Sequence, residues 1–188
     1  MSTWMVVEDE PDIYEVLLAM FEMWGIEGVA FVDGEEAVAW IDEVDRGEFE
    51  GELPELALLD IRLPGSISGP MVGERLRKSP ILQHSAIVLS TAYRLSAEEE
   101  KGVIERAGAD HLMYKPLPKF NELKKLLEGI IAERRAKKAE AAKAAETPNT
   151  NAATQPAMPP IAPPPQPPTL PEVEEAETEV VSSKKEEK

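Results

Sequence analysis

Five short apolar runs alternate along residues 1–131 with five segments whose apolar residues recur at helical spacing. Short apolar runs predict buried strands, and helical spacing predicts amphipathic helices. Strands this apolar, joined by helices, imply a parallel sheet that is covered on both faces. We therefore predict an α/β fold, a doubly wound five-stranded parallel sheet with five helices. The expected strands are 4–7, 26–32, 56–60, 86–89 and 111–114, and the expected helices are 11–24, 34–45, about 70–78, 96–107 and 118 onward.

Several helix ends are marked by individual residues. Pro11 suits the first turn of a helix, and Gly25 follows the last residue of the same segment. Ser96 and Glu99 have the spacing of a capping box, which predicts where the fourth helix starts.

The composition changes after residue 131. No aromatic residue occurs beyond Phe120, and ten of the 17 prolines lie in 147–188. Residues 132–146 are strong helix formers with almost nothing to bury. We expect a globular domain over 1–131, an exposed helical extension over 132–146, and a disordered Pro-rich and acidic tail over 147–188.

The net charge of −16 is carried mainly by the predicted domain. Residues 1–131 hold 26 acidic and 12 basic residues, whereas 132–188 hold 10 and 8. An acidic domain disfavours direct DNA binding, because phosphate backbones need a basic face. The chain has no cysteine, no apolar run of membrane-spanning length and no N-terminal pattern of a secretory signal. We expect a soluble, cytoplasmic protein without membrane insertion.

The predicted strands deliver polar residues to one edge of the sheet, since functional residues of such sheets collect at the carboxyl ends of the strands. The residues at those ends are Glu8, Asp9, Glu10, Asp60, Ser90, Thr91 and Lys115. Three carboxylates in one cleft either hold protons at raised pKa values or bind a hard cation such as Mg²⁺. In the second case Lys115 and Thr91 suit a phosphoryl group beside the ion, and Asp60 is placed as its nucleophile.

Four motifs carry a resemblance to the receiver domain of two-component response regulators, including the single-domain chemotaxis type. They are VVEDEPDI (6–13), LLDIRLP (58–64) with Gly69 beyond it, VLSTA (88–92) and YKP (114–116). The resemblance implies a flavodoxin-like fold in which Asp60 accepts phosphate from a phosphohistidine of a sensor histidine kinase or phosphotransfer protein. It also implies that Thr91 and Lys115 assist, and that phosphorylation shifts the surface of the fourth helix, fifth strand and fifth helix to control an unknown downstream protein.

The same resemblance implies a magnesium site. Asp9 and Asp60 would bind Mg²⁺ directly, Glu8 would act through water, and the backbone carbonyl of Arg62 would add a ligand. Lys115 and Pro116 would be joined by a cis peptide bond.

Leu112 and the loop PGSISGP (64–70), which is slightly longer than the family norm, depart from the family pattern. Leu112 stands where many members have an aromatic switch residue, so Tyr93 or Tyr114 would have to take over that role. Arg62 and Tyr93 each lie two residues beyond a site residue. Both are bulky, and we predict that they restrict attacking water and give a long-lived phosphoryl group.

Three other functions are compatible with parts of the sequence. A phosphohydrolase of the haloacid dehalogenase type also forms an aspartyl phosphate, but it needs an aspartate where this chain has Arg62. Residues 132–188 contain no helix-turn-helix with an apolar core, which argues against a DNA-binding regulator. A scaffold pseudo-receiver that is never phosphorylated stays open. The basic patch over 134–138 is either a solvated helical face or a dock for an acidic partner.

Overall fold

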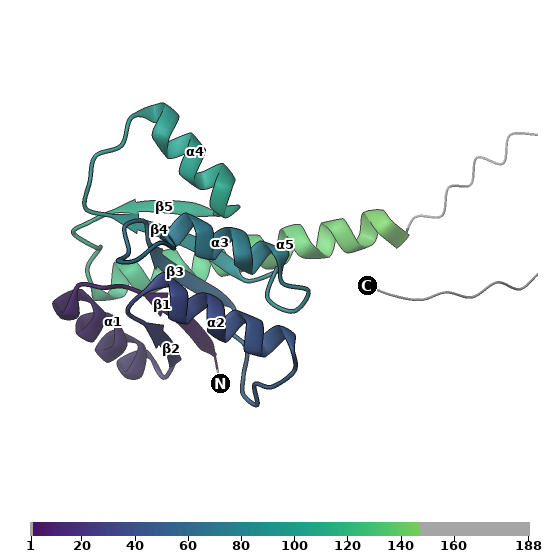
Figure 1. The fold of residues 1–188 in the computed structure, drawn as a ribbon. Helices are drawn as coiled ribbons and strands as arrows, with labels where there is room; N and C mark the ends of the chain where they lie inside the picture. Colours follow the sequence, from purple (N-terminus) through teal and green to yellow (C-terminus); the bar gives the residue numbers. More distant parts are fainter. Residues whose placement is uncertain (1, 147–188) are drawn as a thin grey trace, which may run out of the picture. The chain divides into compact units, whose positions relative to one another are not determined.

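The computed structural model describes residues 2–146, and these form the predicted α/β sandwich (Figure 1). All neighbouring strands are parallel, in the order β2-β1-β3-β4-β5. The strands are β1 (Thr3–Val7), β2 (Glu27–Phe31), β3 (Leu56–Asp60), β4 (Ala86–Thr91) and β5 (His111–Tyr114). The helices are α1 (Pro11–Trp24), α2 (Gly34–Asp45), α3 (Gly69–Lys78), α4 (Ala97–Ala107) and α5 (Phe120–Glu146).

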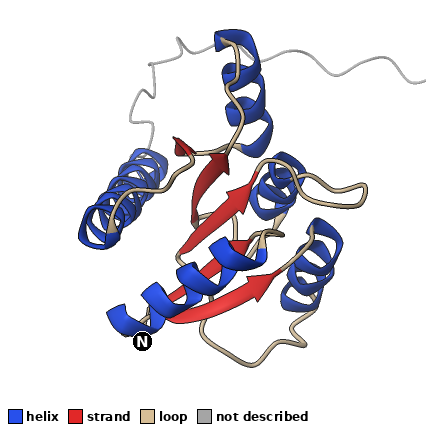
Figure 2. Ribbon diagram, turned by 90° about the vertical axis from the view of Figure 1, so that its left-hand side faces the viewer, coloured by secondary structure: helices blue, strands red, loops and turns tan. Residues whose placement is uncertain are grey.

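Helices cover both faces of the sheet, as Figures 1 and 2 show. Successive strand residues point to opposite faces, so each central strand supplies two cores. Met5, Ala57 and Ile87 pack in the core that contains residues of α2, α3 and α4. Their neighbours along the strands, including Trp4 and Leu58, pack against α1 and α5. This two-sided burial explains why the strands read as continuous apolar runs.

The strand limits differ from the prediction at four places, by one or two residues each. Strand β1 starts at Thr3, one residue early, and β2 ends at Phe31, one residue early. The prediction ended the fourth strand at 89 because Ser90 and Thr91 are polar. In the structure β4 continues through both residues, because Ser90 pairs with Asp60 in the sheet. Strand β2 starts one residue late, at Glu27, because the N–H of Ile26 donates to the Phe21 carbonyl at the end of α1. Contacts with neighbouring elements, and not local composition, therefore set the end of β4 and the start of β2.

The marked helix ends are confirmed. Gly25 follows α1 with φ +70°, a left-handed conformation that glycine adopts without strain. Ser96 and Glu99 form both bonds of the capping box at the start of α4. Helix α3 begins at Gly69 and α5 at Phe120, one residue before and two residues after the predicted starts.

Helix α5 extends to Glu146, well past the sheet. Residues 132–143 are mostly exposed, although Arg134 and Arg135 bond to side chains of the domain. The division of the chain at 131 and 146 stays a prediction, and the predicted disordered tail over 147–188 lies outside the described residues. Within 2–146, no helix has the length and apolar character needed to cross a membrane.

Candidate functional site

Three carboxylates meet at the carboxyl edge of the sheet. Asp60 ends β3, and Glu8 and Asp9 directly follow β1, which pairs with β3. One oxygen from each carboxyl lies within 4.8 Å of the others. Glu8 and Asp60 are 2% and 6% exposed, whereas Asp9 is open to solvent. The topology thus brings together the three side chains that the sequence analysis named as metal ligands.

Lys115 joins this acidic cluster from the far side of β4. Its Nζ donates to Asp60 Oδ2 at 2.9 Å and to Glu8 Oε1 at 2.9 Å. The main-chain N–H of Lys115 donates to the Thr91 carbonyl at 2.8 Å, which extends the β4–β5 pairing to the lysine. The peptide bond to Pro116 is cis, as expected.

Glu10 was expected at this edge of the sheet without a role in the site, and the structure places it among the site residues. Its Oε1 accepts a third bond from Lys115 Nζ at 3.0 Å, while its own N–H donates to Glu8 Oε1 at 3.3 Å. An acidic residue is also favourable in the first turn of a helix, so the sequence alone is equally compatible with a solvated Glu10. The run of three acidic residues at 8–10 was the available signal.

Burial dominates the electrostatics of the cluster. The pKa of Asp60 is raised, because burial disfavours the charged carboxylate more than the bond from Lys115 favours it. The pKa of Glu8 is raised for the same reason, with repulsion from Asp60 as an additional cause. For Lys115, burial alone would lower the pKa, but bonds to three carboxylates raise it above its ordinary value. The lysine is therefore firmly cationic and compensates two carboxylates that are almost fully buried.

Thr91 lies at the end of β4 with its side chain buried. Its Oγ1 accepts the N–H of Tyr93 at 3.1 Å. A hydroxyl that accepts one bond keeps its proton available for another acceptor. In the sheet, Asp60 pairs with Ser90, so Thr91 stands one position beyond the aspartate on the neighbouring strand. Among the described residues no hydrogen bond joins Thr91 to Asp60.

The loop after β3 is fixed closely against Asp60. The N–H of Arg62 donates to Asp60 Oδ1 at 3.3 Å. A Cβ on Gly69 would overlap the main-chain oxygen of Asp60, so this position requires glycine. The guanidinium of Arg62 lies over the Tyr93 ring, 3.8 Å from its centroid. This cation–π pair links the loop after β3 to the loop after β4.

The position that departs from the family pattern packs inward. Leu112 is partly buried against the core beneath α4. Tyr114, two residues on, lies at the surface, where its hydroxyl donates to the Glu100 carboxylate and accepts the N–H of Leu95 at 3.4 Å. Tyr114 therefore connects β5 to α4 and to the loop that precedes it.

The donor set fits a hard divalent cation. Mg²⁺ takes oxygen ligands, commonly one or two carboxylates together with waters and phosphate oxygens. The acidic cluster provides three carboxylates within 4.8 Å of one another, one of them exposed, and no competing nitrogen or sulfur ligand is offered by it. The chemistry of these residues is thus compatible with magnesium, although Lys115 already compensates part of the negative charge.

Comparison with known proteins agrees with the fold. The family model of the response regulator receiver domain matches residues 4–128, and the chain belongs to this family. Receiver domains are signalling modules of phosphorelay systems and not conventional enzymes, and they interact with sensor histidine kinases or phosphotransfer proteins. No curated protein matches the chain.

Solved structures resemble the receiver portion along almost their whole length. The response regulator TrrA of Thermotoga maritima, solved in complex with Mg²⁺-BeF, is 31% identical with a TM-score of 0.54, covering 69% of this chain and 99% of that one. The receiver domain of a sensor histidine kinase from Pseudomonas aeruginosa PAO1, solved with magnesium in its active site cleft, is 26% identical with a TM-score of 0.57, covering 70% and 98%. A CheY-like receiver domain protein from Methanospirillum hungatei, at 23% identity and a TM-score of 0.59, covers 73% and 98% and supports the fold alone.

Proposed function

We propose that Asp60 accepts a phosphoryl group from a phosphohistidine of a sensor histidine kinase or phosphotransfer protein. The observation that carries this proposal is the position of Lys115, whose Nζ forms ion pairs with the buried carboxylates of Asp60 and Glu8 at 2.9 Å each. A buried strand that ends in a carboxylate is costly, and here it ends beside a fixed cation and two further carboxylates. Such an arrangement suits phosphoryl transfer, in which positioning and charge neutralisation matter more than a general base.

In the proposed transfer, a carboxylate oxygen of Asp60 attacks the phosphorus atom of the phosphohistidine. A P–O bond forms as the P–N bond breaks, and the electron pair of that bond returns to the imidazole nitrogen. The product is an acyl phosphate, so no proton has to leave Asp60, which is ionised when it attacks. Lys115 then neutralises charge on the new phosphoryl group, and the free hydroxyl proton of Thr91 is donated to one of its oxygens.

The metal ligands in this proposal are Glu8, Asp9, Asp60 and the main-chain carbonyl of Arg62. When bound there, Mg²⁺ supplies positive charge beside the phosphoryl oxygens. The exposed Asp9 leaves one side of the cluster open to solvent, from which a cation and a phosphoryl donor can approach.

The proposed output is a shift of the face formed by α4, β5 and α5, which controls a partner protein in the cytoplasm. The bonds of Tyr114 to Glu100 and Leu95 support a coupling between β5 and α4 on this face. A scaffold that is never phosphorylated is the alternative, and Leu112 in place of an aromatic residue is the observation that favours it.

Intact mass spectrometry after incubation with acetyl phosphate and Mg²⁺ tests the proposal. The full chain should gain a single phosphoryl adduct, and the adduct should be lost in Asp60→Asn and when the metal is chelated. Asp42→Asn, which changes an aspartate that pairs with Arg75 on the α2–α3 surface, is the matched control and should keep the adduct. If the wild-type chain gained no adduct, even with several sensor kinases as phosphoryl donors, the phosphoacceptor function would be refuted and the scaffold function favoured.

A further inference from the structure

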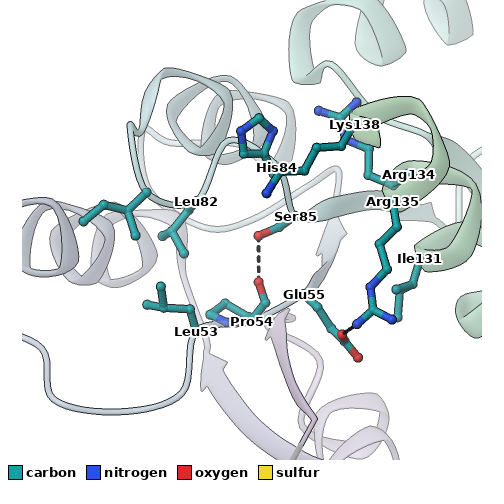
Figure 3. A pocket seen from close by; sticks show the side chains of 11 residues that line it. Leu53, Pro54, Glu55, Leu82, His84, Ser85, Ile131, Arg134, Arg135 and Lys138 are labelled. Atoms are coloured by element: carbon teal, nitrogen blue, oxygen red, sulfur yellow. Dashed lines mark hydrogen bonds and ion pairs between the residues drawn. The ribbon is translucent and has the colours of Figure 1, made fainter. Parts of the chain in front are cut away.

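A groove opens at the amino-terminal edge of the sheet, on the side away from Asp60. Figure 3 shows it between α5 and the segments that lead into β3 and β4. Its volume is about 250 Å³. Pro54, Leu82 and Ile131 line it, and Leu53 and Ile81 at its border are 44% and 41% exposed. Aliphatic side chains of this size at a concave site are available to cover an apolar group of another molecule.

Cations surround this apolar lining. Helix α5 contributes four of them: Arg134, Arg135, Lys137 and Lys138. Arg77 of α3 lies beside them in an adjoining hollow of about 450 Å³, which shares His84, Arg134 and Lys138 with the groove. The two hollows thus form one concave surface along the end of α5, which we call the α5 groove.

Most of these cations have partners, but the balance is positive. Asp110 forms ion pairs with Arg77, Arg134 and Lys137 at 3.0, 3.5 and 4.0 Å. Glu55 forms an ion pair with Arg135. Lys138 forms no ion pair with any residue whose side chain the structure describes. Five cations therefore meet two carboxylates, in a domain whose net charge is strongly negative.

The environment of His84 reflects this excess. Burial lowers the pKa of the imidazole, and the positive charges of Lys138, Arg134 and Arg77 lower it further. Figure 3 shows His84 and Lys138 on the same side of the groove. An added proton is disfavoured at this place, and an added negative charge is favoured.

We propose that the α5 groove binds an acidic peptide segment of a partner protein, one that carries apolar side chains between its carboxylates. The excess of cations selects for carboxylates, while the exposed Leu53 and Ile81 select for an apolar side chain next to them. A nucleic acid fits less well, because the remainder of the domain would repel its backbone. A small inorganic anion would leave the aliphatic border uncovered.

The proposed dock is separate from the phosphoryl site. Glu55 immediately precedes β3 and Asp60 ends it, so the two sites lie at opposite ends of a five-residue strand, about 17 Å in length. A partner in the α5 groove leaves the Asp60 edge accessible. The inference therefore goes beyond the proposed phosphoryl transfer and does not depend on it.

Fluorescence anisotropy with the full chain tests this assignment. The probe is a fluorescein-labelled peptide in which glutamate alternates with leucine, and its controls carry lysine for glutamate or serine for leucine. We expect saturable binding of the first peptide alone, weakened by salt because screening shortens the reach of the cations. Lys138→Glu should weaken binding about fivefold, and Ile81→Ser about threefold.

Two matched variants separate the groove from general effects. Lys143→Glu makes the same charge change further along α5, and Val16→Ser removes an exposed aliphatic side chain from α1, so both should bind as the wild type does. Circular dichroism verifies that each variant is folded. Equal losses in Lys138→Glu and Lys143→Glu, or equal binding of the serine peptide, would overturn the assignment. The assignment would also be overturned if the probe bound only after a dimer had been diluted to monomers, or only after the glutamates of 172–179 had been replaced. In either case the groove would be occupied by this chain itself.

Discussion

Removing the cation of Lys115 should destabilise the fold in a way that depends on pH. In Lys115→Met the apolar stem is kept, but the carboxylates of Glu8 and Asp60 lose their partner while staying buried. Breaking a buried ion pair from one side costs about 3–5 kcal/mol. The cost has an upper limit, because a buried carboxylate without a partner can take up a proton instead. Protonating a carboxyl of ordinary pKa, near 4, at pH 7 takes about 4 kcal/mol. Glu10 adds little, because its side chain is half exposed. We expect a loss of about 3 kcal/mol at pH 7.

The direction of the pH dependence follows from the raised pKa values of Glu8 and Asp60. A group whose pKa is higher in the folded state contributes stability below its unfolded pKa and loses it as the pH rises through the folded pKa. Without Lys115 both pKa values rise further. The deficit of the variant should therefore shrink as the pH falls from 7 to about 5.5, and Mg²⁺ at about 10 mM should reduce it at pH 7 by binding the folded state.

Urea unfolding followed by circular dichroism measures this difference. Lys101→Met, which removes an exposed lysine 3.7 Å from Glu105, is the control and should change stability by less than about 0.5 kcal/mol. A loss below about 1 kcal/mol in Lys115→Met, or a loss of equal size at pH 7 and pH 5.5, would refute the claim that this lysine compensates buried carboxylates.

Three further perturbations test other parts of the molecule. Gly69→Ala should lower the free energy of unfolding by more than about 2 kcal/mol, because its Cβ overlaps the Asp60 main-chain oxygen; a urea midpoint like the wild type's would contradict this. Ser96→Ala should cost about 1 kcal/mol by removing the capping box of α4, whereas Ser68, which precedes α3 and makes no side-chain cap bond, should tolerate alanine in the same assay. Arg62→Ala should shorten the lifetime of the phosphoryl adduct about threefold by exposing the site to water, with unchanged decay as the contrary result.

Much of the architecture could be predicted because its determinants are local. Apolar runs and helical spacing gave the order of ten elements, and Pro11, Gly25 and the Ser96–Glu99 pair marked helix ends through bonds within a single turn. The carboxyl-end rule for parallel sheets then placed Asp60 at the same edge as the acidic residues after β1, since the carboxyl ends of parallel strands share one edge. The end of β4 and the start of β2 could not be predicted from local sequence. Pairing with β3 extends β4 to include Ser90, and the N–H of Ile26 donates to the end of α1, so Ile26 does not belong to β2.

The sequence by itself determined the class of fold and the residue types at the site, since period and composition are properties of neighbouring residues. Only the tertiary structure decided which charges share a partner. Glu10 bonds to Lys115, 105 residues away, and the hydroxyl of Tyr114 bonds to Glu100. The α5 groove arises in the same way, because the chain brings Leu53, Ile81 and the cations of α5 together from three separate segments. Contacts of this range depend on the packed positions of whole elements, which local periodicity does not encode.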